Sequence, residues 1–272
     1  MAVSPAELAS YEELAHELAE DAMREIAAAR LQHGDRRTKK DASDWVTSVD
    51  LAVERHTRDR IAERFPTHGL IGEEFGRSGE TGEDALVWYI DPVDGTTNFV
   101  HGLPWASFSL ALADRDGLLV GVVADPARGE LFSAVRGGGA VLNGAPIRCR
   151  GEELLGGAVL MELAGVECWP GMLEVMTSLS TQKCVTRIMG SSALTLASIG
   201  AGRAAGCVMA GFNPIDVAAG VLVAREAGAT VLCGGETATL LGAGPLGAQR
   251  LLAATPGTLP ALVELVESAS AR

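Results

Sequence analysis

The sequence predicts a protein that mixes helices and strands, with a different pattern in each of its two parts. Two stretches with apolar residues at helical spacing occupy most of the first 65 positions. Short apolar runs separated by turn signals follow, a pattern that is typical of an antiparallel sheet. From about residue 151, apolar runs alternate with helical segments. We therefore expect an α+β N-terminal half, residues 1–150, and an α/β C-terminal half, residues 151–272, in one continuous structural unit.

The two N-terminal helices have recognisable boundaries. The stretch Ser4-Pro5-Ala6-Glu7 combines a capping box with proline at the first helical position, so the first helix should run from there to about Leu31. The polar stretch 33–45 has no apolar period, and we expect a loop there. A second helix is expected over 49–65, because Pro66 cannot continue it.

The remaining elements follow from apolar runs and turn residues. In the N-terminal half, strands packed against the two helices are expected over 85–90, 107–113, 118–124 and 130–135. The dipeptides Asp116-Gly117 and Asn143-Gly144 indicate hairpin turns. In the C-terminal half, strands are expected near Val159, Val185, Cys207 and Val231, with helices over 192–201 and 216–227.

Composition and charge exclude several classes of protein. The 272 residues include 22 Lys and Arg against 35 Asp and Glu, and the net charge of −13 would repel nucleic acid and anionic membranes. The five cysteines form no C-x-x-C pair, which favours free thiols in a reducing cytoplasm over a zinc site or disulfide framework. Neither a secretory signal nor an apolar run of about 18 residues is found. We expect a cytoplasmic protein with no nucleic-acid or membrane partner.

The chemistry is expected to lie in a cluster of carboxylates. Asp91 and Asp94 follow a buried apolar run, and the proline between them lets both side chains converge on one point beyond the strand. Glu73 lies upstream, and Asp216 begins a distant helical segment, where a helix N-terminus can help hold a cation and a bound phosphate. Carboxylate oxygens are the ligands that Mg²⁺ prefers, so the pattern indicates a phosphoryl-transfer site.

These motifs carry a resemblance to a known family. The run Asp91-Pro92-Val93-Asp94-Gly95-Thr96-Thr97, with Gly72-Glu73-Glu74 before it and the segments 216–220 and 226–228 after it, resembles the inositol monophosphatase family of magnesium-dependent, lithium-sensitive phosphatases. The stretch from Lys39 through Asp44 to Asp50 is similar to the family's mobile loop and the start of its second helix. The resemblance implies a five-layered αβαβα sandwich of the inositol monophosphatase and fructose-1,6-bisphosphatase type. It also implies a site between the two halves, and a homodimer.

The resemblance also implies a set of metal ligands. Glu73, Asp91 and the backbone carbonyl of Val93 would bind a first ion. Asp91, Asp94 and Asp216 would bind a second, and a third, weaker ion would be held partly by Glu73 through water. The implied cofactor is Mg²⁺, two to three ions per site, with Mn²⁺ as an alternative because oxygen ligands do not rank the two.

Two cations bridged by one carboxylate can carry out the reaction without a protein nucleophile. One ion lowers the pKa of the attacking water and the other stabilises the leaving oxygen. The resemblance makes Thr96, hydrogen-bonded to Asp50, the group that orients and helps deprotonate this water, with Glu73 assisting. The backbone N–H groups of Gly95 and Thr96 would hold phosphate oxygens.

The substrate side departs from the family pattern. The implied substrate contacts are Asp94, Gly95, Thr96, Thr97, Ser191, Ser192, Met209 and Asp216. Where members that act on inositol phosphates have a glutamate, this chain has Met209; a usual tryptophan is Ile215, and a Gly-Ser pair is Ala164-Gly165. Because methionine cannot accept hydrogen bonds from substrate hydroxyls, we expect phosphomonoester hydrolysis to be kept while myo-inositol phosphate need not be the preferred substrate.

The predicted function is Mg²⁺-dependent hydrolysis of a small phosphorylated metabolite, namely a sugar, polyol or related monophosphate. The alternatives within the enzyme class are a nucleotide 3′-phosphate, histidinol phosphate and fructose 1,6-bisphosphate, including a substrate from a specialised biosynthetic pathway. A hypothesis from another class is a regulatory or binding protein that keeps the fold, since some relatives also bind the transcription apparatus. Retention of the complete set of expected metal ligands argues against a catalytically dead scaffold.

Overall fold

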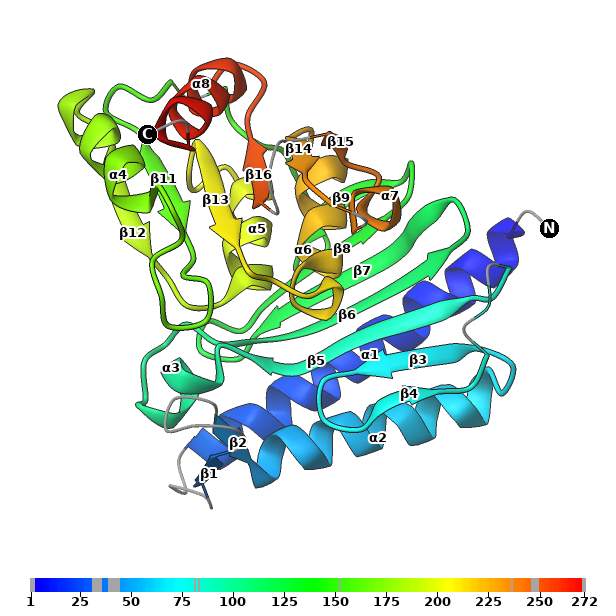
Figure 1. Cartoon of the computed structure of the whole chain (residues 1–272). Coiled ribbons are helices and arrows are strands. Elements are labelled where there is room, and N and C mark those ends of the chain that lie inside the picture. Colours follow the sequence, from blue (N-terminus) through cyan, green and yellow to red (C-terminus); the bar gives the residue numbers. More distant parts are fainter. Residues whose placement is uncertain are drawn as a thin grey trace.

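The structure, a computed structural model, describes residues 3–30, 36–38, 45–80, 82, 84–151, 153–235, 237–245 and 250–270. Its elements are stacked in five layers: helices, sheet, helices, sheet and helices (Figure 1). The five-layered αβαβα sandwich is therefore confirmed. In the described part of the chain, no helix is long and apolar enough to cross a membrane.

The first layer consists of α1 (Pro5–Arg30) and α2 (Ser48–Arg64), which lie along one face of the larger sheet (Figure 1). The capping box of α1 is present, because Ser4 N donates to Glu7 Oε2 at 2.8 Å and Glu7 N donates to Ser4 Oγ at 3.3 Å. Leu14 and Leu18 are buried between the helix and the sheet. Both helices occur where their boundary signals predicted them.

The larger sheet has eight strands. They are β3 (Gly69–Gly72), β4 (Gly76–Ser78), β5 (Val87–Asp94), β6 (Ser107–Asp114), β7 (Gly117–Asp125), β8 (Glu130–Val135), β9 (Gly139–Leu142) and β10 (Ala145–Ile147). Their order is β10-β9-β8-β7-β6-β5-β3-β4, and only β3 and β5 pair in parallel. Both predicted hairpins exist, and the turn at Asn143-Gly144 places those residues at φ 49° and 77°, as an Asn-Gly hairpin turn requires.

Two expectations for the N-terminal half need correction. The stretch 33–45 is not entirely a loop, because β1 (Arg36–Thr38) pairs antiparallel with β2 (Trp45–Thr47). Lys39 and Asp44 lie outside the described residues. The strand expected over 85–90 extends to Asp94, so Asp91 and Asp94 lie within its C-terminal end rather than beyond it. The register shifts between them, as expected where a proline cannot donate to the ladder.

The middle layer consists of α5 (Ser192–Gly200) and α6 (Pro214–Glu226), whose residues are almost all buried between the two sheets. Helices that are apolar on every side are typical of such a position. Small residues allow them to approach closely: a Cβ on Gly220 would lie 2.7 Å from the carbonyl oxygen of Ala193. This pair of helices forms the shared core of the two halves.

The second sheet has six strands. They are β11 (Ala158–Met161), β12 (Val185–Ile188), β13 (Gly206–Ala210), β14 (Thr230–Cys233), β15 (Gly244–Pro245) and β16 (Arg250–Ala254), in the order β12-β11-β13-β16-β14-β15. Its outer face packs against α4 (Met172–Thr181) and α8 (Leu259–Ser270). The short helices α3 (Thr96–Val100) and α7 (Thr237–Leu241) complete the described elements. The four strands predicted in this half are confirmed, and β16, which was not predicted, pairs antiparallel with both β13 and β14.

Candidate active site

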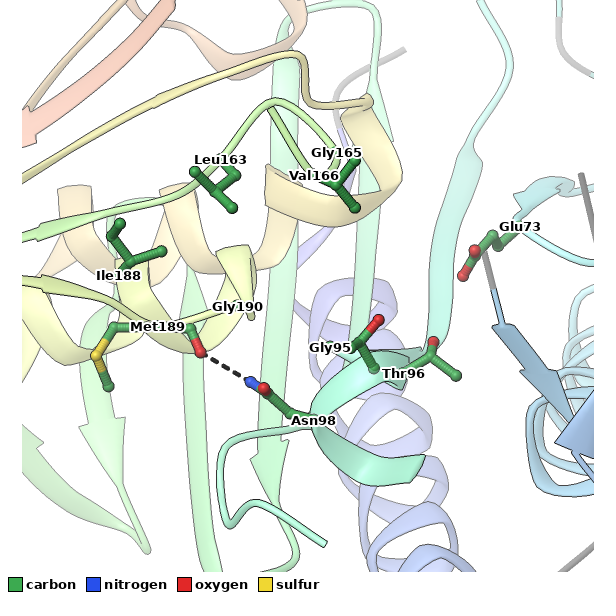
Figure 2. A pocket seen from close by; sticks show the side chains of 11 residues that line it. Glu73, Gly95, Thr96, Asn98, Leu163, Gly165, Val166, Ile188, Met189 and Gly190 are labelled. Carbon is green, nitrogen blue, oxygen red and sulfur yellow. Dashed lines mark hydrogen bonds between the residues drawn. The ribbon is translucent and has the colours of Figure 1, made fainter. Parts of the chain in front are cut away.

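A cleft lies where the two halves meet. It consists of two adjoining pockets of about 400 Å³ and 350 Å³, which share Glu73, Leu163, Gly165, Ile188 and Gly190 as lining residues. Figure 2 shows one of these pockets, with Glu73 and Thr96 on one side and Leu163 and Ile188 on the other. The cleft is large enough to hold a small organic molecule.

Asp94 connects the end of β5 to the start of α5. Its carboxylate, only 7% exposed, accepts hydrogen bonds from Ser191 Oγ at 2.5 Å and from Ala193 N at 2.8 Å. Asp91, also buried, accepts a hydrogen bond from Val93 N at 3.0 Å. Ser191 was expected to contact the substrate; the structure corrects this, because its buried hydroxyl contacts Asp94 and it does not line the cleft.

The surroundings of the acidic side chains in the site disfavour their ionised form. Burial raises the pKa of Asp94 to about 8, although its hydrogen bond with Ser191 acts in the opposite direction. Burial, followed by the neighbouring charges of Glu73 and Asp94, raises the pKa of Asp91 well above its ordinary value. The pKa of Asp216 rises to about 6, again chiefly through burial. Buried carboxylates that repel one another in this way are expected where a cation normally supplies the missing positive charge.

The donor set fits a hard cation. Glu73, Asp94, Glu162 and Asp216 all line the cleft, and among the described residues no Lys, Arg or His does. Oxygen donors alone select Mg²⁺ or Mn²⁺ over softer metals. Across the described ranges, no three acidic, histidine or cysteine side chains converge closely enough to hold an ion by themselves. Backbone carbonyl, water or phosphate oxygens would therefore have to complete the coordination.

Thr96 and Asp50 are brought together as the resemblance implied. The Thr96 hydroxyl lies 3.4 Å from Asp50 Oδ1 and donates to the carbonyl of Val93 at 2.9 Å. Asp50 is wholly buried and accepts hydrogen bonds from the backbone N–H of Thr47, at 3.0 Å, and from its hydroxyl. Burial raises the pKa of Asp50 to about 6. The pair is thus held rigidly between α2 and the end of β5.

The remaining predicted residues fall into two groups. Gly95, Thr97 and Ser192 line the cleft, as does Asp216, whose carboxylate accepts a hydrogen bond from Asn213 N at 2.8 Å in the capping box of α6. Met209 is a correction: its side chain is wholly buried in the core between the second sheet and the middle helices, and it does not line the cleft.

Glu54 is a residue that sequence reasoning missed. It lies on α2 with no exposed surface, and its carboxylate accepts hydrogen bonds from the backbone N–H groups of Glu74, at 2.7 Å, and Phe75, at 3.1 Å. It therefore fixes the turn that carries Glu73. Gly72 leaves room for it, since a Cβ there would lie 2.1 Å from Glu54 Oε1. The available signal was its place on the buried face of an otherwise polar helix.

We expect Glu54→Gln to lower the free energy of unfolding by about 3 kcal/mol. The substitution leaves the half-buried Arg58 guanidinium, 2.8 Å away, without its charged partner, and it turns an NH₂ group toward one of the two backbone N–H donors. Chemical denaturation measures this change. The matched control is Glu63→Gln on the same helix, whose side chain is 79% exposed, with an expected change below about 0.5 kcal/mol. Equal costs for the two variants would contradict the role given to Glu54.

Glu162 was also missed. It follows β11, is buried, and accepts hydrogen bonds from Gly190 N at 2.7 Å and Thr195 Oγ1 at 2.6 Å. Burial raises its pKa to about 7. Its position directly after a predicted strand near Val159 was the signal that could have identified it. Glu162 holds the turn before α5 in place and thereby supports the contact of Ser191 with Asp94.

Comparisons with known proteins agree over most of the chain. The sequence model of the Inositol monophosphatase family matches residues 7–271. A Nus factor SuhB of Pasteurella multocida is 41% identical over 197 residues, covering 71% of this chain and 73% of the relative. The extragenic suppressor protein suhB of Bartonella henselae superposes with a TM-score of 0.83 at 26% identity, covering 96% of this chain and 98% of that one. The IMPase of Thermotoga maritima gives a TM-score of 0.80 at 28% identity, with 93% and 95% covered.

Proposed function

This chain belongs to the inositol monophosphatase family, and from that membership together with the cleft we propose that it is a magnesium-dependent phosphomonoesterase acting on a small sugar, polyol or related monophosphate. The observation that carries the proposal is the convergence of carboxylates from both halves, with Asp94 and Glu162 buried, on a cleft that, among the described residues, no basic side chain lines. A phosphate dianion could enter such a cleft only if cations accompanied it.

The proposed ligands are those implied by the resemblance. Glu73, Asp91 and the carbonyl of Val93 would hold one ion, Asp91, Asp94 and Asp216 a second, and Glu73 would share in a third. Bound Mg²⁺ supplies positive charge to the phosphoryl oxygens and acidifies a bound water. Mg²⁺ commonly keeps several waters when it binds protein, so it suits a site in which side chains alone do not complete the coordination.

The protein's own groups would orient the water and the phosphate. Asp50 and the Val93 carbonyl both lie within hydrogen-bond distance of the Thr96 hydroxyl, so the Thr96 oxygen is held at the edge of the cleft near Glu73 (Figure 2). The attacking water would donate to Thr96, and its proton would pass to Asp50 or Glu73. The N–H groups of Gly95 and Thr96 would bind phosphate oxygens, and the alcohol would leave toward the C-terminal half.

A binding or regulatory role is the second candidate. The observation that favours it is the name of the relative, Nus factor SuhB, which describes a factor and names no enzyme activity. The net charge of −13 argues for a protein rather than a nucleic-acid partner in that case. The two roles differ in whether they depend on the buried carboxylates.

Location and assembly are part of the same proposal. We place the protein in the cytoplasm, and its five cysteines, all free thiols, suit a reducing compartment. We also propose a homodimer, as the family resemblance implied. The two halves, 1–150 and 151–272, would act as one continuous unit, because residues from both line the cleft.

Phosphate release from a panel of esters tests the proposed activity. The panel contains inositol 1-phosphate, fructose 1,6-bisphosphate, histidinol phosphate, adenosine 3′,5′-bisphosphate and several sugar and nucleoside monophosphates, each with Mg²⁺ and with chelator. We expect turnover of at least one monophosphate that stops when chelator is added. Turnover that chelator leaves intact would contradict the metal assignment, and no turnover at all would put the binding role first.

A further inference from the structure

We propose that the cleft selects the monophosphate of an uncharged alcohol with an apolar face, such as a ring, and that Leu163, Val166 and Ile188 form the surface on which this face packs. This proposal rests on the proposed phosphatase function. Within the proposed range of sugar, polyol and related monophosphates, it favours the esters whose leaving alcohol is the less polar. Three observations support it: the apolar side of the cleft, the hydrogen bonds that Glu162 and Asn98 already make within the protein, and the charge of the cleft.

The first observation is an exposed apolar wall. Val166 and Ile188 are 67% and 46% exposed, and both line the same pocket as Glu73 and Thr96. Figure 2 shows Leu163 and Ile188 across the cleft from Glu73 and Thr96, with Val166 between them in this view. Apolar side chains gathered at the mouth of a polar site mark a surface that a ligand covers. A phosphate held beside Thr96 would therefore direct its alcohol toward this wall.

The second observation concerns Glu162 and Asn98, two polar residues of the cleft lining that already make hydrogen bonds within the protein. The Glu162 carboxylate already accepts hydrogen bonds from Gly190 N and Thr195 Oγ1. The Asn98 amide donates to the carbonyl of Met189 at 2.8 Å (Figure 2) and to the carbonyl of Trp105 at 2.8 Å. A polyol would have to exchange its bonds to water for contacts with Leu163 and Ile188, which is unfavourable for hydroxyl groups. An apolar ring loses nothing by the same transfer.

The third observation is charge. Four carboxylates line the cleft, and in the described part of its lining no Lys or Arg faces the apolar wall. A second phosphate or a carboxylate on the alcohol would therefore lie away from the proposed metal ligands, and no described side chain would supply a counter-charge. Bisphosphates such as fructose 1,6-bisphosphate and adenosine 3′,5′-bisphosphate are thus disfavoured, and a neutral leaving alcohol is favoured.

Three synthetic esters test the proposal with Mg²⁺ present: 2-phenylethyl phosphate, glycerol 1-phosphate and 2-(4-carboxyphenyl)ethyl phosphate. The leaving group of each ester is a primary alcohol, so the three esters have similar intrinsic reactivity. Differences in kcat/KM therefore report the contacts that the leaving group makes with the protein. We expect the wild-type kcat/KM for 2-phenylethyl phosphate to exceed that for glycerol 1-phosphate by about tenfold or more. The carboxylated ester should lose most of this advantage.

Variants at the exposed wall separate packing from folding. Val166→Ser and Ile188→Asn should each reduce the preference for 2-phenylethyl phosphate over glycerol 1-phosphate by about fivefold. Leu155→Ser is the matched control, because Leu155 is 69% exposed and lies outside the cleft; both kcat/KM values should be unchanged.

Different outcomes distinguish the two proposals. Metal-dependent release from glycerol 1-phosphate that equals or exceeds release from 2-phenylethyl phosphate would overturn the selectivity and leave the phosphatase standing. An equal loss for both esters in the wall variants would also overturn it. A change in sedimentation of Ile188→Asn, without a change in preference, would assign the wall to a contact between protein copies instead. Absence of metal-dependent release from every ester would overturn both proposals.

Discussion

Replacement of Asp94 by asparagine is expected to lower kcat for phosphate release by about 10³-fold. Asparagine keeps an acceptor for the hydrogen bonds from Ser191 and Ala193, so the local geometry should persist. What is lost is the negative charge that would hold the second ion. A binding role that does not depend on metal should survive the same change. Phosphate release with saturating Mg²⁺ measures the effect, and Asp116→Asn, at an exposed turn, is the control.

The same substitution should raise the stability of the metal-free protein. The pKa of Asp94 is about 8 in the folded chain against an ordinary value of 3.8. At pH values between these two, the folded state therefore binds more protons than the unfolded state. Wild-type stability without metal should therefore fall as the pH rises from about 4 to about 8. Asp94→Asn removes this contribution and should show a shallower fall. Near-normal turnover in the variant, or an unchanged pH dependence of its unfolding, would contradict the assignment.

Gly95→Ala is expected to lower the free energy of unfolding by about 3 kcal/mol and to abolish activity. Gly95 has φ 87°, and a Cβ there would lie 2.6 Å from the carbonyl oxygen of Gly190 and 3.0 Å from that of Trp105. Both contacts are backbone atoms, so relief requires α3 and the turn before α5 to separate. That movement would displace Thr96 and Asp94 together.

Gly102→Ala isolates the backbone strain in this prediction. Gly102 has φ 73°, but a Cβ there would meet nothing within 4 Å, so the expected cost is only about 1 kcal/mol. Thermal unfolding compares the two variants directly. Equal losses would show that positive φ alone, rather than close contact between the halves, explains the need for glycine at position 95.

The parts of the fold that follow local rules could be predicted from the sequence. The capping residues of α1, the proline after α2 and the Asn-Gly turn of β9 and β10 each act over a few positions, and all were recognised. Pairing between distant segments could not be predicted in this way. The insertion of β16 between β13 and β14 depends on the packing of the whole sheet. The strands β1 and β2 have only three residues each, too few to show an apolar period in the sequence.

In the candidate site, too, residues that form a local motif could be predicted from the sequence, and residues that depend on distant segments could not. Asp91, Asp94 and Thr96 could be predicted as site residues because they form one compact motif in the sequence. Glu54 and Glu162 were missed because each is a single acidic residue in an ordinary helix or strand end, and only the fold brings its backbone partners to it. Sequence position also does not give side-chain direction. Met209 and Ser191 were both expected to contact the substrate. Met209 instead packs in the core, and Ser191 contacts Asp94 rather than the cleft.

The central claim is that divalent cations bind between carboxylates contributed by both halves. Mn²⁺ binding, counted by electron paramagnetic resonance in the presence of inorganic phosphate, tests it on the wild type and on Asp216→Asn. This substitution changes only the C-terminal half. We predict at least two ions per wild-type chain and one fewer in the variant. No bound ion in the wild type, or an equal number in both proteins, would contradict the account.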